Sequence, residues 1–178
     1  FFTEEYRLNH LIFTYPKPYI AFMDGVVMGG GMGISQGASL RIVTERSKVA
    51  MPETNIGLFP DVGGGYFLSR CPGASGEYLA LTGQLMVGGE AIALGLADKL
   101  VNSADMPALW DVLSNQPSLS VSDRLDRLED LLGGSQAIPE PAWLNGQIDA
   151  IFSLETISEI VTALDNDGSD WANQTLDV

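Results

Sequence analysis

Basic side chains are scarce in this chain. Its 178 residues include 9 Lys and Arg against 23 Asp and Glu, which gives a formal net charge of −14. Nucleic acids and anionic membrane surfaces are bound through clusters of Lys and Arg that neutralise phosphate groups. The composition therefore argues against both kinds of partner.

Cysteine and histidine are almost absent as well. Cys71 is the only cysteine and His10 the only histidine. A single cysteine excludes an internal disulfide framework and fits a reducing compartment. The sequence also lacks the clustered His, Cys or carboxylate residues that metal sites need. We therefore expect no metal and no bound cofactor.

Long apolar runs are missing too. A membrane-spanning helix needs about 20 consecutive apolar residues. The most apolar stretch, residues 78–101, is interrupted by several glycines and by Glu90 and Asp98. We expect no transmembrane helix.

Apolar residues and glycine are abundant: 46% of the chain is hydrophobic and 20 residues are glycine. This composition is typical of a packed α/β domain and not of a disordered chain. Near Asn102 a glycine-rich part, residues 1–102, gives way to an acid-rich part, residues 103–178. We predict short strands and helices in the first part and a helical region in the second.

Hydrophobic periodicity and turn residues predict the individual elements. Helices are expected over 4–13, 34–40, 62–70, 76–82, 89–94, 122–132, 143–152 and 155–164, and strands over 19–23, 40–43, 48–51 and 99–101. Because glycine has a low helix propensity, residues 29–31 are expected to form a turn that leads into the helix of 34–40. Pro52 suits the first position of a short helix.

Two glycine clusters and two acids lie close together between residues 28 and 65. The sequence reads MGGGMG at 28–33, AMPE at 50–53 and GLFPDVGGG at 57–65. Glycines let backbone N–H groups approach a ligand, and acids in apolar surroundings have raised pKa values that suit acid–base chemistry. This pattern suggests a site for a carbonyl compound, with a glycine N–H facing a developing oxyanion and with Glu53 and Asp61 as acids.

Each of these residues also has a purely structural interpretation. The glycines can form a tight turn without a ligand, Glu53 can complement a helix dipole, and Asp61 can cap the helix that follows it. Spacing alone leaves both interpretations open. The sequence GISQG at 33–37 matches a nucleophile elbow, but no strand precedes Ser35 and the only histidine lies upstream, so we do not expect a serine hydrolase.

Residues 1–101 resemble the crotonase superfamily of enoyl-CoA hydratases and isomerases. The resemblance is carried by KPYIA at 17–21, GVVMGGG at 25–31, PE at 52–53, IG at 56–57 and AIALGLAD at 91–98. MPETNIGLFPDVGGGYFL at 51–68 and EEYRLN at 4–9 are similar to the branch that hydrolyses hydroxyacyl-CoA thioesters. The resemblance implies an α/β fold, a partial spiral of ββα units, followed by a helical C-terminal region.

The resemblance also implies roles for single residues. Gly30 matches the glycine whose N–H forms one arm of the oxyanion hole for a thioester carbonyl. Glu53 matches the carboxylate shared by hydratases and hydrolases, Asp61 the second acid of the hydrolases, and Glu5 a position that lines the acyl pocket and would bind the substrate's hydroxyl. The implied activity is hydrolysis of a short hydroxyacyl-CoA, 3-hydroxyisobutyryl-CoA foremost, as in valine breakdown. Coenzyme A is then part of the substrate.

One position departs from the hydratases of the superfamily. They carry a second glutamate three residues after the oxyanion glycine, and here that residue is Gly33. Because the addition of water to a C=C bond uses both carboxylates, this departure favours hydrolysis. The alternatives are a double-bond isomerase that uses Glu53 and Asp61, a hydratase, and a non-catalytic interaction module.

Both ends of the sequence suggest a piece of a longer protein. The chain begins at Phe1 without a methionine, and the resemblance implies that the first ββα units and the second oxyanion N–H precede it. We expect a cytoplasmic location in preference to the mitochondrial matrix, and a homo-oligomer is left open.

The 178-residue chain by itself is expected to be inactive, because half of the implied oxyanion hole lies outside it. The measurement is CoA release from 3-hydroxyisobutyryl-CoA, followed with a thiol reagent. Turnover by the purified chain would contradict this expectation.

Overall fold

The computed structural model describes residues 1–114, 118–133, 138 and 141–177. Its core holds two three-stranded sheets, with strand orders β1–β3–β6 and β2–β4–β5. All neighbouring strands are parallel except β4 and β5. The strands are β1 (Ile20–Met23), β2 (Val26–Met28), β3 (Leu40–Thr44), β4 (Lys48–Ala50), β5 (Met86–Val87) and β6 (Lys99–Val101).

A unit of two strands and a helix repeats along the chain. β1 joins the first sheet, β2 joins the second, and α2 (Gly30–Ser35) leads to β3, which returns to the first sheet. In the next unit Leu40 pairs with Ile20, and Lys48 pairs with Val26. Each of these strands therefore pairs with its counterpart from the previous unit, which confirms the expected ββα spiral.

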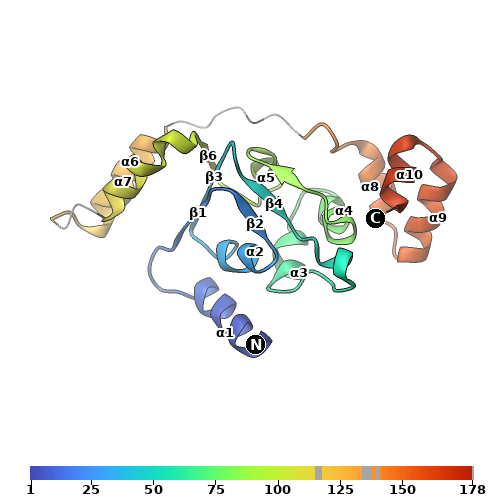
Figure 1. The fold of residues 1–178 in the computed structure, drawn as a ribbon, viewed down its shortest axis with the longest axis horizontal. Coiled ribbons are helices and arrows are strands. Elements are labelled where there is room, and N and C mark those ends of the chain that lie inside the picture. The colour runs from blue at the N-terminus through green and yellow to red at the C-terminus, as the bar shows by residue number, and fades with distance from the viewer. Residues whose placement is uncertain (115–117, 134–137, 139–140, 178) are drawn as a thin grey trace.

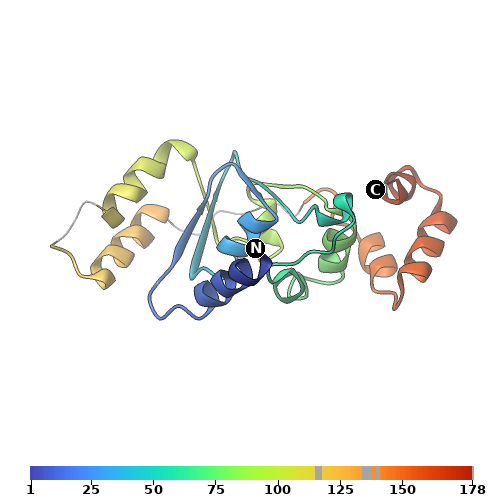
Figure 2. The same ribbon diagram turned by 60° about the horizontal axis from the view of Figure 1, so that its bottom comes forward.

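Helices surround the two sheets. In the first part of the chain they are α1 (Phe2–Phe13), the 3₁₀ helix η1 (Glu53–Ile56), α3 (Gly64–Leu68), α4 (Ser75–Thr82) and α5 (Glu90–Ala93). α1 lies beside α2 in both ribbon views (Figures 1 and 2). The ring of Phe13, at the end of α1, packs edge-on against Tyr66 of α3 with 5.1 Å between the centroids.

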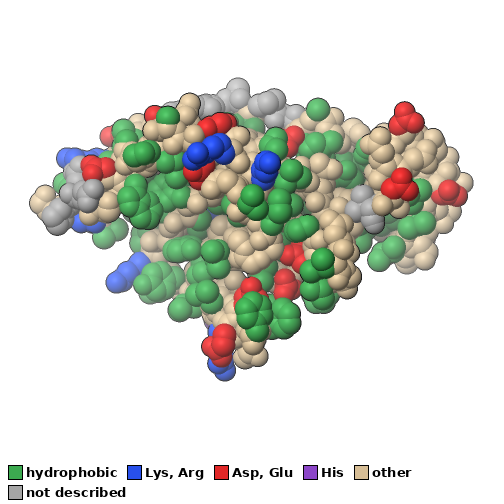
Figure 3. All heavy atoms as spheres, viewed as in Figure 1, with side chains coloured by type: hydrophobic (Ala, Val, Ile, Leu, Met, Phe, Trp, Pro, Cys, Tyr) green, Lys and Arg blue, Asp and Glu red, His purple; other side chains and the backbone are tan. Residues whose placement is uncertain are grey.

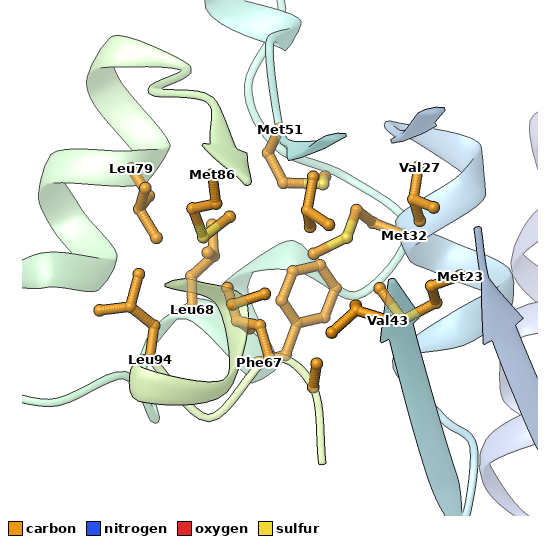
Figure 4. Close-up of a cluster of buried hydrophobic side chains, with 14 of the residues drawn as sticks. Met23, Val27, Met32, Val43, Met51, Phe67, Leu68, Leu79, Met86 and Leu94 are labelled. Carbon is orange, nitrogen blue, oxygen red and sulfur yellow. The ribbon is translucent and has the colours of Figure 1, made fainter. Parts of the chain in front are cut away.

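The main core lies between the sheets and helices α2 to α5. Figure 4 shows its side chains converging from both sheets and from the helices, with Met23, Met32, Met51 and Met86 among them. All four methionines are at most 2% exposed. Burial of such a side chain contributes about 1.5–3 kcal/mol, so this cluster holds the ββα units together.

Two groups of helices follow β6 and lie at opposite ends of the core (Figure 1). Their bounds are η2 (Ser103–Asp105), α6 (Met106–Ser114), α7 (Val121–Leu132), α8 (Gly146–Phe152), α9 (Ile157–Asp167) and α10 (Asp170–Leu176). α6 and α7 bury Leu109 and Leu128 against Ile42 of β3. Helices α8 to α10 pack against Tyr78 of α4. Both groups share clusters with the first part, so the division at residue 102 stays a prediction.

The ends of two of these helices follow directly from the sequence. Ser120 and Asp123 form a capping box at the start of α7, and Thr156 and Glu159 form one at α9. Each box satisfies backbone N–H groups that a helix start leaves without partners. Among the described residues, no helix combines the length and apolar character needed to span a membrane.

The expected helix of residues 34–40 is wrong. α2 begins at Gly30, ends at Ser35, and Leu40 belongs to β3. Each glycine inside a helix costs about 1 kcal/mol, but close packing of α2 against its neighbours outweighs this local preference. The short strands β2 and β5 and the helices η2 and α6 were not predicted, and the other predicted elements are present with ends shifted by a few residues.

The contact between α3 and α4 generates a prediction. A Cβ on Gly76 would lie 2.0 Å from the carbonyl oxygen of Leu68, whereas a Cβ on Gly65 would meet nothing within 4 Å. Gly76→Ala should therefore destabilise the protein by about 1–3 kcal/mol or more, because two backbones must separate. Gly65→Ala, the matched control, should be neutral or stabilising by up to about 1 kcal/mol. Urea unfolding measures both, and equal effects would contradict the packing.

Candidate active site

Glu53 lies at the start of η1, directly after Pro52, and only 8% of it is exposed. Its Oε1 atom approaches the backbone of Gly29 so closely that a Cβ there would lie 2.8 Å away. Gly29 also has a φ of +51°, which L side chains rarely adopt. Both facts require glycine at position 29 and place the Glu53 carboxylate against the start of α2.

The second oxygen of Glu53 has no hydrogen-bond partner. Oε2 is buried and unpaired among the residues that the structure describes. Burial raises the pKa of Glu53, and the nearby negative charge of Asp61 raises this pKa further. A carboxyl group with a raised pKa and a free oxygen is suited to proton transfer or to attack on an electrophile.

Asp61 lies between η1 and α3. Its Oδ2 accepts a hydrogen bond of 2.8 Å from the hydroxyl of Tyr6 on α1. This hydrogen bond raises the pKa of Tyr6. The alternative that Asp61 caps the following helix is wrong, because the N-cap of α3 is Gly63 and no side chain caps it. The carboxylate is therefore turned toward α1 and the site.

Glu5 lies beside Gly30. A Cβ on Gly30 would lie 3.1 Å from Oε1 of Glu5. Glu5 and Tyr6 are neighbours on α1, so this helix touches the start of α2 with one residue and Asp61 with the next. The structure thus brings together all four predicted site residues: Glu5, Gly30, Glu53 and Asp61.

Position 33 has no room for a side chain. A Cβ on Gly33 would lie 2.6 Å from Cβ of Val62 and 2.9 Å from Nδ2 of Asn9. Val62 is the only described residue other than glycine with a positive φ, at +43°. This strained backbone turns the Val62 side chain into the space beside Gly33. Position 33 therefore carries no acid in the sequence, and the present packing of Val62 and Asn9 leaves no space for one there.

Tyr6, Asn9 and Val62 were not predicted as site residues. Tyr6 and Asn9 share a face of α1 because they are three residues apart, and Asn9 is four residues after Glu5. That spacing is visible in the sequence. The contact of this face with α2 and with the Asp61 loop arises only in the folded chain.

Other reactive side chains lie away from these acids. The Ser35 hydroxyl is buried and donates to the carbonyl oxygen of Met32. Burial raises the pKa of Cys71 to about 11, so it behaves as a small apolar residue. His10 is exposed on α1. No group of three His, Cys, Asp or Glu residues that could hold a metal ion occurs within the described ranges.

Known proteins are similar to this chain over nearly all of its length. A family model described as enoyl-CoA hydratase/isomerase matches residues 1–178. The chain is 45% identical to the mitochondrial 3-hydroxyisobutyryl-CoA hydrolase of Danio rerio, over 97% of the chain and 46% of that protein. It is 40% identical to the human protein of the same name, over 100% of the chain and 47% of that protein.

A third relative has a different description. The small ribosomal subunit protein mS47 of Neurospora crassa is 40% identical, over 99% of the chain and 38% of that protein. The chain spans about half the length, or less, of these curated relatives. The names of the two hydrolases place those proteins in mitochondria and lend no support to the expected preference for the cytoplasm.

Solved structures share the fold. A carnitinyl-CoA dehydratase from Mycobacterium thermoresistibile superposes with a TM-score of 0.82 at 36% identity, over 98% of this chain and 49% of that chain. An enoyl-CoA hydratase from Rhodobacter sphaeroides gives a TM-score of 0.82 at 39% identity, over 97% and 48%. With the ββα spiral, and with a family model that matches every residue, the chain belongs to the enoyl-CoA hydratase/isomerase family.

Proposed function

We propose that the full-length protein hydrolyses a short hydroxyacyl-CoA thioester, with 3-hydroxyisobutyryl-CoA as the substrate. The observation that carries this proposal is the buried Glu53 carboxylate, with one unpaired oxygen, beside Asp61 and the start of α2. Identities of 40–45% to proteins named 3-hydroxyisobutyryl-CoA hydrolase support the choice of substrate.

Each site residue has a role in this proposal. The thioester oxygen accepts a hydrogen bond from the N–H of Gly30, which stabilises the negative charge that develops there. Glu53 either removes a proton from water as the water attacks the carbonyl carbon, or attacks that carbon itself to form an anhydride that water then opens. In both routes the C–S bond breaks, a C–O bond forms, and CoA leaves as the thiol.

Asp61 positions water or assists proton transfer. Tyr6 supports this role, because its hydroxyl binds one carboxylate oxygen and leaves the other available. Glu5 lines the acyl pocket beside Gly30. No metal or bound cofactor takes part in the proposed reaction.

A hydratase is the first alternative, and the solved relatives described as dehydratase and hydratase favour it. The crowding at Gly33 weighs against it. A second carboxylate at this position would collide with Val62 and Asn9. With position 33 closed, the carboxylates of the site are Glu53 against Gly29, Glu5 beside Gly30, and Asp61.

A non-catalytic role is the other alternative, and the relative described as a ribosomal subunit protein favours it. The contact of Glu53 with Gly29, next to Gly30, and the influence of the Asp61 charge on the pKa of Glu53 support catalysis. For location, the relatives named mitochondrial support the mitochondrial matrix.

The role of Glu53 can be tested in the full-length protein. Glu53→Gln should lower kcat for 3-hydroxyisobutyryl-CoA by about 10²–10⁴-fold, because the amide can neither accept the proton nor attack. Glu129→Gln, on the exposed face of α7, is the matched control and should keep wild-type activity. Near-normal hydrolysis by Glu53→Gln would show that this assignment is wrong.

The pH dependence gives a second test. Glu53 acts in its ionised form, so kcat/KM should rise with pH through the pKa of Glu53, above the ordinary carboxyl value of about 4.3. The charge of Asp61 raises this pKa, so Asp61→Asn should move the acid limb of the residual activity to lower pH. Asp126→Asn on α7 should leave the limb in place. A limb that Asp61→Asn leaves unmoved, or moves upward, would contradict the coupling.

The crowding at position 33 gives a third test. Gly33→Ala should destabilise the full-length protein by about 1–3 kcal/mol and lower hydrolysis, since the new Cβ meets Val62. Adding Val62→Gly removes that contact. The destabilisation of the double variant should therefore be smaller than the sum of the two single destabilisations by about 0.5–3 kcal/mol. Additive effects in urea unfolding would contradict the contact.

The variant Gly33→Glu should not catalyse hydration of an enoyl-CoA. Loss of the enoyl absorbance measures this reaction.

A further inference from the structure

The side chain of Asn9 carries two unpaired polar atoms. Both Nδ2 and Oδ1 are buried without a hydrogen-bond partner in the described part of the chain. An unsatisfied buried amide is unfavourable. A ligand that completes these hydrogen bonds would remove this cost.

Asn9 lies one helical turn beyond the oxyanion glycine. Its Nδ2 is 2.9 Å from the position of a Cβ on Gly33. Gly33 follows Gly30 by three residues, so the two glycines are about 4.5 Å apart along the axis of α2. Glu5 and Asn9, four residues apart on α1, run alongside, with Glu5 at Gly30 and Asn9 at Gly33.

A cavity of about 300 Å³ lies next to Asn9, between α1, α2 and α3, with Tyr6, Gly33 and Val62 also on its wall. Glu5, Gly30, Glu53 and Asp61 are not among the residues that line it. Its volume is at the lower end of the range for small-molecule sites and exceeds the needs of a four-carbon acyl group.

The chemistry of a 3-hydroxyacyl group matches this spacing. Its hydroxyl oxygen is three bonds of about 1.5 Å from the thioester carbon, which span up to about 4 Å when extended, close to the rise of about 4.5 Å between Gly30 and Gly33. A hydroxyl has one proton to donate and two lone pairs to accept. The carboxylate of Glu5 accepts only, whereas the amide of Asn9 offers N–H donors.

We propose that Asn9 is a specificity-determining residue that recognises the 3-hydroxyl of the acyl group. The hydroxyl accepts a hydrogen bond from Nδ2 of Asn9 and donates a hydrogen bond to the carboxylate of Glu5. An acyl group without the hydroxyl leaves the amide unpaired, so the site discriminates against it. The inference rests on the proposed function.

Comparison of two thioesters tests this role in the full-length protein. 3-Hydroxyisobutyryl-CoA carries the hydroxyl, and isobutyryl-CoA differs only in lacking it. Asn9→Leu should lower kcat/KM for the hydroxylated ester by about 10–100-fold and change the value for isobutyryl-CoA by less than about threefold. The ratio of kcat/KM for 3-hydroxyisobutyryl-CoA to that for isobutyryl-CoA should therefore fall by a similar factor.

Two further variants make the result specific. Arg7→Leu makes a similar polar-to-apolar change on the exposed face of α1 and should leave the selectivity of the wild type unchanged. Asn9→Asp keeps the size and an acceptor but loses the N–H donor, so it should show the same selective loss as Asn9→Leu. Asn9→Asp also serves if the leucine variant does not fold.

The outcomes separate the two proposals. If wild-type protein releases CoA from neither ester, the proposed function fails. If the wild type hydrolyses the hydroxylated ester and the Asn9 variants lose both esters by the same factor, or lose neither, Asn9 does not recognise the hydroxyl. A selective loss in both Asn9 variants, with Arg7→Leu unaffected, supports the proposal.

Discussion

The docking of α1 against the core is the interaction on which the candidate site depends. None of the residues of α1 is buried. The face of the molecule drawn in Figure 3 shows exposed hydrophobic side chains near this helix. Its contacts include the Tyr6–Asp61 hydrogen bond of 2.8 Å, the packing of Phe13 on Tyr66, and a close approach at Gly37, where a Cβ would lie 3.1 Å from the backbone nitrogen of Phe13. Because α1 supplies Glu5, Tyr6 and Asn9, the same contacts that anchor the helix also assemble the acyl side of the site.

Crowding at the start of α2 decides which chemistry the site can support. Gly29 admits the Glu53 carboxylate against the backbone, and Gly33 is closed by Val62 and Asn9. The Glu53 carboxylate is thus buried and has a raised pKa, and a second carboxylate at position 33 is excluded. Gly29, the N-cap of α2, therefore admits an acid, whereas Gly33 inside α2 leaves no space for one.

Much of the fold could be predicted from the sequence. The strands around β1, β3, β4 and β6 and most helices follow from apolar periodicity, turn glycines and capping residues such as Ser120, because these signals act within a few residues. The predicted site residues Glu5, Gly30, Glu53 and Asp61 came from motif resemblance, and they lie together in the structure. The helix at Gly30–Ser35 could not be predicted, since glycine propensity opposes it and only packing against α1, Glu53 and Val62 accounts for it.

The family, the ββα repeat and the identity of the acids follow from the amino-acid sequence, because they depend on local pattern and on motif residues. The burial, pairing and orientation of those residues arise only when the chain folds. Burial of Glu53, the bond from Tyr6 that turns Asp61 away from a capping role, and the unpaired amide of Asn9 all arise between segments distant in the chain. Desolvation, steric exclusion and hydrogen-bond pairing depend on which groups meet in space, and no local pattern specifies that.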